Sequence, residues 1–157
     1  MGEYATVRDK LEGGTMFRQK FLAISLLVFI LFSQMLPHAS AAGICDWAKF
    51  ISDVTVTDGA YFPAGAPFVK TWRVQNIGTC TWTKSYSLAF YSGEMLGAVT
   101  PVMLNKEVKP GEIVDISVNM VAPQKGGYHD STWKLSNASG VRFGIGSNAD
   151  MPISATI

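Results

Sequence analysis

Ile113-Val-Asp-Ile-Ser-Val-Asn-Met-Val121 is the stretch that decides the fold of this chain. Apolar side chains alternate with polar ones along it, and this period of two predicts a β-strand with one buried face and one wet face. Pro110 and Gly111 precede the stretch and Pro123 follows it, so turns bound the strand on both sides. A sheet that is dry on one face must pack that face against a second layer.

The same punctuation recurs along the chain after residue 42. Segments rich in apolar and β-branched residues lie between turn signals, and no segment there has a helical period. We therefore expect about seven to nine strands in an all-β, antiparallel, immunoglobulin-like sandwich. Besides the first stretch, the expected strands are Ala48–Val56, Phe68–Gln75, Ser87–Tyr91, Tyr128–Leu135, Val141–Ile145 and Ile153–Ile157.

The alternation within these segments predicts which side chains face the core. Phe68 and Trp72 share an inner face, as do Trp133 and Leu135, whereas Phe143 is expected to share one with its neighbours Val141 and Ile145. Lys70 falls on the face of Trp72, and we expect it near the strand end with its amine in water. Tyr128 follows Gly127 and is a candidate tyrosine corner, with its hydroxyl bonded back to the backbone.

The first part of the chain has the order of a secretory signal. Residues 17–20 are a short basic lead, residues 21–32 are a twelve-residue, mainly apolar run, and Ala39-Ser-Ala41 is a small-x-small cleavage site. The run is shorter than the roughly 20 apolar residues of a membrane-spanning helix. We therefore expect a signal helix within a signal peptide at 16–41, cleavage after Ala41 and a mature domain at 42–157.

Two alternatives stay open at this end of the chain. An uncleaved signal segment would remain as a membrane anchor, which is the sole membrane contact that we expect. The polar leader at 1–15 fits no signal pattern, so translation starts either at Met1 or at Met16, and in the second case the leader is a start-site artefact.

Cys45 and Cys80 are the two cysteines, and both lie in the exported part. An even count outside the cytosol favours a disulfide, which would stabilise the fold by roughly 3–4 kcal/mol on the chain-entropy model. Two buried free thiols are the alternative. A zinc site is disfavoured because zinc takes four nitrogen or sulfur ligands, and His129 is the one histidine after residue 42.

Charge and motif content exclude several classes of function. The part from residue 42 holds nine Lys or Arg and nine Asp or Glu, so it has no net charge to attract nucleic acid. No nucleophile with a base, paired carboxylates or phosphate loop is indicated. We expect no enzyme, no cofactor and no metal, and His129 is expected at the surface or at a strand end.

The stretch Phe68-Val-Lys-Thr-Trp72-Arg-Val-Gln-Asn76-Ile-Gly78-Thr-Cys80-Thr-Trp82 carries a family resemblance. Its spacing W-x-x-x-N-x-G-x-x-x-W resembles the four-tryptophan (FW) domain, the Ig-like central domain of the next-to-BRCA-one type autophagy receptor, which also occurs in exported bacterial proteins. Further similarity includes Gly127-Tyr128, Trp133-Lys-Leu135 and Phe143-Gly144.

The resemblance implies an Ig-like sandwich that binds proteins without catalysis. Three of the family's four tryptophans correspond to Trp72, Trp82 and Trp133. The fourth, expected soon after Phe143-Gly144, is absent, so a surface that the family builds there does not carry over. Trp47 restores the count of four at a different position. The pairing of the two cysteines is similar to that of the exported bacterial members.

The aromatic residues divide into a core set and a candidate binding set. Trp72 and Trp133 are expected in the core, while Trp82 follows a turn and is either a cap of the sandwich or part of a surface. The candidate binding aromatics, for which rim packing is the alternative, are Trp47, Tyr61, Phe62 and Tyr91. We therefore expect an extracytoplasmic protein-recognition module, and the alternative is a carbohydrate-binding or cell-wall-attachment module that uses aromatics at turns.

Overall fold

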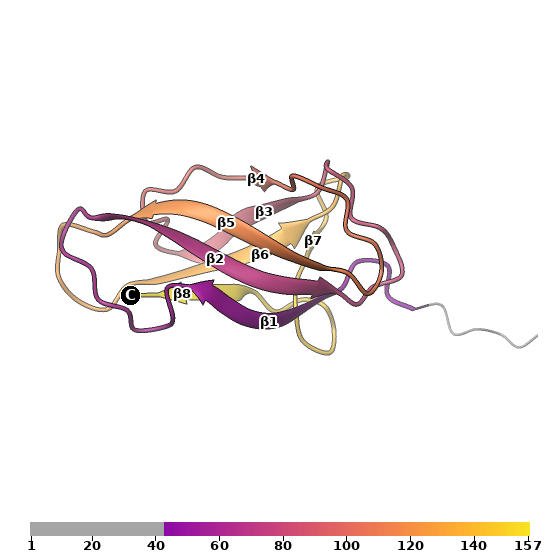
Figure 1. Cartoon of the computed structure of the whole chain (residues 1–157), viewed down its shortest axis with the longest axis horizontal. Coiled ribbons are helices and arrows are strands. Elements are labelled where there is room, and N and C mark those ends of the chain that lie inside the picture. The colour runs from indigo at the N-terminus through magenta and orange to yellow at the C-terminus, as the bar shows by residue number, and fades with distance from the viewer. Residues whose placement is uncertain (1–42) are drawn as a thin grey trace, which may run out of the picture. The chain divides into compact units, whose positions relative to one another are not determined.

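The stretch Ile113–Val121 forms one strand, β5, whose side chains alternate between exposed and buried along its whole length. The computed structural model describes residues 43–157, and all regular structure in that part is β (Figure 1). The other strands are β1 (Ala48–Thr55), β2 (Pro67–Asn76), β3 (Ser87–Gly93), β4 (Val102–Met103), β6 (Asp130–Ser136), β7 (Arg142–Phe143) and β8 (Ile153–Thr156). The expected signal helix, cleavage site and start sites lie outside the described residues.

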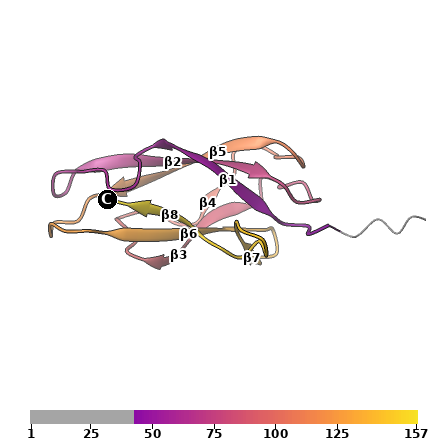
Figure 2. The ribbon, with the colours of Figure 1, turned by 90° about the horizontal axis from the view of Figure 1, so that it is seen from below.

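The strands form two antiparallel sheets that face each other as layers (Figure 2). One sheet has the order β1-β2-β5, and the other has the order β4-β3-β6-β7, with β8 also paired to β6. The all-β, antiparallel architecture expected from the sequence is thereby confirmed. Residues 42–157 make up one compact unit. Within residues 43–157, no helix is long and apolar enough to cross a membrane.

The core lies between the layers and is built around indole rings. Trp72 of β2 and Trp133 of β6 are fully buried, and their ring centroids lie 6.1 Å apart across the two sheets. The Nε1 of Trp72 donates to the carbonyl of Ser154 in β8 at 2.7 Å, and the Nε1 of Trp133 donates to the Ser131 hydroxyl at 2.9 Å. Each indole therefore buries its apolar surface while its polar edge stays hydrogen-bonded.

The turn after β2 explains the residues Asn76 and Gly78. The buried side chain of Asn76 donates to the carbonyls of Cys80 and Val108, both at 2.9 Å, and accepts from the backbone N–H of Gly78 at 3.0 Å. A Cβ at Gly78 would overlap the carbonyl oxygen of Cys45, so glycine permits this close approach. The turn thus brings Cys45 and Cys80 together, and they form the disulfide expected from the sequence.

Lys70 departs from expectation. It lies within β2, its side chain is 0% exposed, and its Nζ donates to Asp53 Oδ1 and to the carbonyl of Val56, each at 2.6 Å. The prediction of an amine in water was wrong because β1 supplies a carboxylate directly beside the inner face of β2. An internal cation is tolerated when a partner of opposite charge and hydrogen bonds accompany it.

Three further expectations need correction. Tyr128 is 76% exposed and is neither core nor a tyrosine corner, because β6 begins only at Asp130 and the chain passes through Gly127 (φ 145°) before it. Val141 is 60% exposed because its backbone closes the turn with Asn137 rather than extending β7. The short strand β4 was not anticipated.

Candidate binding site

The four candidate binding aromatics do not form one surface. Trp47 is half-buried just before β1, where its Nε1 donates to the Gly146 carbonyl at 2.7 Å. Tyr91 lies on β3, 45% exposed, with Lys134 Nζ 4.2 Å from its ring centroid. Tyr61 and Phe62 lie in the connection between β1 and β2. Three separate parts of the domain therefore hold them.

Tyr61 and Phe62 border a small hollow of about 200 Å³ that also contacts His129. Tyr61 is 88% exposed, whereas Phe62 stacks on Phe68 with ring centroids 4.4 Å apart. Phe62 is thus rim packing on the core, which was the alternative reading, and Tyr61 stands alone as an exposed ring.

The remaining family-motif residues are structural. Trp82 is 0% exposed and packs on Phe143, with ring centroids 5.5 Å apart, so it closes the core and offers no surface. Trp72, Trp133 and Phe143 are likewise buried. These positions can affect binding only by holding the two sheets in place.

His129 lies directly before β6, at the strand end that was one of its two expected positions, and it is buried rather than on the surface. Its Nδ1 lies 2.9 Å from Glu94 Oε1, and its Nε2 lies 2.8 Å from the Lys125 carbonyl. Both partners accept hydrogen bonds, so the arrangement is complete when both ring nitrogens carry protons. The hydrogen bond to Glu94, followed by that to Lys125, raises the pKa of His129. Among the described residues, no group of three His, Cys, Asp or Glu side chains is placed to hold a metal.

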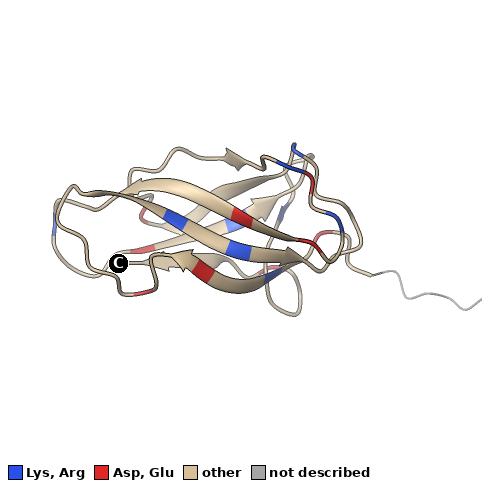
Figure 3. Cartoon of the chain, in the orientation of Figure 1, with Lys and Arg blue, Asp and Glu red and all other residues tan. Residues whose placement is uncertain are grey.

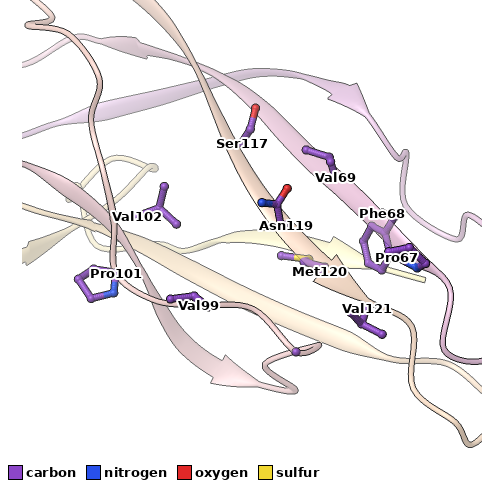
Figure 4. Close-up of a pocket in the computed structure, with 11 residues that line it drawn as sticks. Pro67, Phe68, Val69, Val99, Pro101, Val102, Ser117, Asn119, Met120 and Val121 are labelled. Carbon is purple, nitrogen blue, oxygen red and sulfur yellow. The ribbon is translucent and has the colours of Figure 1, made fainter.

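An open cleft lies between β5 and the segment that leads into β4 (Figure 4). It measures about 710 Å³, within the size range of ligand sites. Eight of its eleven lining residues are apolar and none is charged. Val99 and Pro101 stand on one side, and Asn119 and Val121 stand on the other.

Much of this apolar lining is in contact with water. Val99 is 84% exposed, Val69 is 46% exposed and Val121 is 40% exposed, while Phe68 and Met120 line the cleft from the core side. Exposed valines beside a cleft indicate a binding surface, because covering them with a partner is favoured by the hydrophobic effect. We define these eleven residues as the β5 cleft.

Sequence reasoning did not find the β5 cleft. The stretch Gly93–Val108 shows no strand period, and the apolar residues Val99, Pro101 and Val102 within it do not by themselves indicate a cleft. That β5 is the last strand of its sheet depends on pairing between segments far apart in the chain, which periodicity does not reveal.

The charges near the cleft are neutralised in pairs. Basic positions on β2 lie beside acidic positions on β1 and β5 (Figure 3). Arg73 makes two hydrogen bonds to the Asp115 carboxylate, at 2.8 and 2.7 Å. This contact raises the pKa of the Arg73 guanidinium and lowers the pKa of Asp115. These two pairs therefore offer no unpaired positive charge to phosphates.

Comparison with known proteins places this domain in a family. Residues 55–149 match the family model described as the Ig-like domain from next to BRCA1 gene. The Danio rerio Protein ILRUN is 38% identical over 96 residues, 61% of this chain and 34% of that protein. The Homo sapiens Next to BRCA1 gene 1 protein is 31% identical over 114 residues, 71% of this chain and 11% of that protein. The Arabidopsis thaliana Protein NBR1 homolog is 29% identical over 100 residues, 62% of this chain and 14% of that protein.

The matches thus span between 11% and 34% of each relative's length. The family model covers more than half of the chain and includes the strands from β2 to β7. This chain therefore belongs to the family of the Ig-like domain from next to BRCA1 gene.

Proposed function

We propose that this protein is a non-catalytic protein-recognition module that works outside the cytoplasm. The main observation behind this proposal is the β5 cleft, which is open, mainly apolar and uncharged and has a volume of about 710 Å³. Family membership supports it, because Ig-like sandwiches are scaffolds that present binding surfaces. The function itself is argued from the surface and not from the fold.

The chemistry of the cleft favours a protein partner over a sugar or a nucleic acid. Sugar sites present aromatic faces to solvent, whereas the aromatic residue in this cleft, Phe68, is 8% exposed and turned to the core. Nucleic acid requires unpaired cations, and Arg73 on the same sheet is paired with Asp115. Exposed valines and prolines suit apolar side chains of another chain.

The disulfide supports a location outside the cytoplasm. Disulfides persist in oxidising compartments, and Cys45 is solvent-exposed, where cytosolic reductants would reach it. The signal pattern at residues 16–41 is consistent with such a location.

Export is tested with the full chain in its native host. We expect the secreted form to begin at Ala42 on N-terminal sequencing and to show no thiol that reacts with an alkylating reagent before reduction. A cytoplasmic product with two reactive thiols would contradict the proposed location. A membrane-bound product that still carries residues 16–41 would show the uncleaved anchor.

Recognition is tested with a photo-crosslinking residue placed at Val99 in the unit 42–157. The matched control carries the same residue at Val141, which is also exposed but lies in the β6–β7 turn. Proteins from the extracytoplasmic fraction should crosslink at position 99 and not at position 141. Equal labelling at both positions would refute the cleft as the site, and binding to a glycan array that Tyr61→Ala or Trp47→Ala abolishes would favour the carbohydrate alternative.

A further inference from the structure

β5 is the edge strand of its sheet, and its residues alternate between the two sides of the strand. Two backbone bonds show that even-numbered positions face β2: Asn76 N–H donates to the Glu112 carbonyl, and Ala122 N–H donates to the Ala66 carbonyl, both at 2.9 Å. Because consecutive residues of a strand point their backbone groups to opposite sides, the odd-numbered positions 113–121 face away from β2. They form the open edge of the sheet.

Both ends of this open edge are already closed. At one end, Val121 N–H donates to the Leu96 carbonyl at 2.7 Å. At the other end, Lys106 Nζ donates to the Ile113 carbonyl at 3.2 Å. These two contacts also confirm that odd positions face outward.

Three residues remain between the closed ends: Asp115, Ser117 and Asn119. Within residues 43–157, the N–H and C=O groups of these three residues have no hydrogen-bond partner, since β5 pairs with β2 alone. All three are exposed. They span roughly 13 Å, the length over which about five extended residues can pair. An edge of this kind is a template for one more strand.

The β5 cleft lies directly along this edge. Ser117 and Asn119 belong to its lining, together with Val99 and Pro101 of the segment that leads into β4 (Figure 4). The unpaired backbone groups and the apolar cleft therefore occupy the same place. Backbone pairing and alternate side-chain pockets are the two parts of recognition by strand addition.

We propose that the partner's recognised element is an extended peptide of about five residues, which pairs with the backbone of Asp115, Ser117 and Asn119 and places apolar side chains in the β5 cleft. This inference rests on the proposed protein-recognition function and deepens it. A second copy of the chain is the less suitable occupant, since its own β5 edge carries the same closures at Val121 and Ile113.

The register defines the pattern of the peptide. Side chains that are opposite one another on neighbouring strands project to the same face of the sheet. Peptide residues opposite Ile116 and Val118 therefore project toward the core side of the cleft, which Met120 lines, and should be apolar. Residues opposite Asp115, Ser117 and Asn119 project to the wet face and tolerate polar side chains. The expected pattern is polar-apolar-polar-apolar-polar.

The test begins with a displayed library of random heptapeptides selected on the unit 42–157. A selected peptide is synthesised, and its affinity is measured by calorimetry for the parent protein and for matched variants. Asn119→Pro removes one outward N–H and leaves the β2 ladder intact, because proline is tolerated on the free side of an edge strand. Asn119→Ala keeps that N–H and is the control.

We expect Asn119→Pro to weaken the peptide about tenfold, the effect of one lost hydrogen bond, and Asn119→Ala to change its affinity by less than about threefold. Val99→Asp should also weaken binding, whereas Val141→Asp should not. In hydrogen exchange, the amides of Asp115, Ser117 and Asn119 should exchange quickly in the free protein and slow down in the complex. N-methylation of alternate peptide residues should abolish binding, which repeats the test without altering the protein's fold.

Three results would overturn strand addition. The first is a selected peptide whose affinity is unchanged by both Asn119→Pro and N-methylation. The protein would then still recognise peptides, but the β5 edge would not be the binding site. The second is a library without binders while the crosslinked partner at position 99 is retained. The third is a dimer in sedimentation analysis that Asn119→Pro dissociates, since a second copy would then occupy the edge. Failure of the proposed function itself differs, because it would remove the crosslinks as well.

Discussion

The buried ion pair between Lys70 and Asp53 predicts that removing the acidic partner destabilises the fold more than removing the basic one. Lys70 Nζ has two partners, Asp53 Oδ1 and the Val56 carbonyl, and it lies 5.4 Å from the ring centroid of Trp72. The side chain of Lys70 is 0% exposed and that of Asp53 is 17% exposed. Removal of Asp53 therefore leaves a charge inside the protein, whereas removal of Lys70 leaves a carboxylate that still touches water.

The magnitudes follow from this asymmetry. Asp53→Ala should destabilise the fold by about 3–5 kcal/mol, the cost of an uncompensated buried charge. Lys70→Met keeps a chain of similar length and should cost about 1–3 kcal/mol, because the carbonyl of Val56 then lacks a donor. The double substitution should be more stable than Asp53→Ala alone, since the second change removes the stranded cation.

The assay is urea unfolding at pH 7 of the parent, both single variants and the double variant. With a typical urea slope, Asp53→Ala should lower the midpoint by about 1 M or more at an unchanged slope. Asp150→Asn, at an exposed position just after a turn, is the control and should leave the midpoint unchanged. The reasoning is refuted if Lys70→Met costs more than Asp53→Ala, or if the double variant is the least stable of the set.

Further predictions concern the core, the histidine and the disulfide. Trp72→Ala should cost about 3–5 kcal/mol through cavity formation, and an unchanged melting temperature would show that its burial is unimportant. Folding raises the pKa of His129 through its hydrogen bond to Glu94. The protonated His129 therefore contributes its full stabilisation below the unfolded-state pKa of about 6.5, and this stabilisation is lost as pH rises through the folded-state pKa. Unfolding midpoints measured from pH 5 to 9 should show this decline, and Glu94→Gln should reduce it; identical profiles would contradict the role of Glu94. Cys45 and Cys80 are 35 positions apart, so reduction of their disulfide should lower the free energy of unfolding by roughly 3–4 kcal/mol. Thermal melting with and without reductant measures this loss. An unchanged melting temperature would mean that the bridge restrains little of the unfolded chain.

Local patterns predicted the elements whose environment they determine. The alternation at Ile113–Val121 marked every buried position of β5, and the turn around Asn76 and Gly78 was visible as a motif. Such features depend on neighbours in sequence. A strand with one dry face can be inferred from its own side chains.

Local sequence patterns did not predict features that depend on residues far apart in the chain. Lys70 looked like a strand-end residue because its carboxylate partner lies 17 positions away, on another strand. Tyr128 looked like a strand residue because nothing in its own segment showed that pairing with β8 begins at Asp130. The β5 cleft needed both the order of strands in a sheet and the path of an irregular segment, neither of which has a sequence period.

The cysteine bridge also determines how the domain responds to force. Strands β1 and β2 both lie between Cys45 and Cys80, inside a covalent ring. Tension applied to the chain ahead of Cys45 passes through the sulfur atoms to Cys80, so it cannot draw out either of these strands while the bridge is intact. Because β5 pairs with β2, the open edge of β5 beside the cleft would stay hydrogen-bonded to its neighbouring strand under tension.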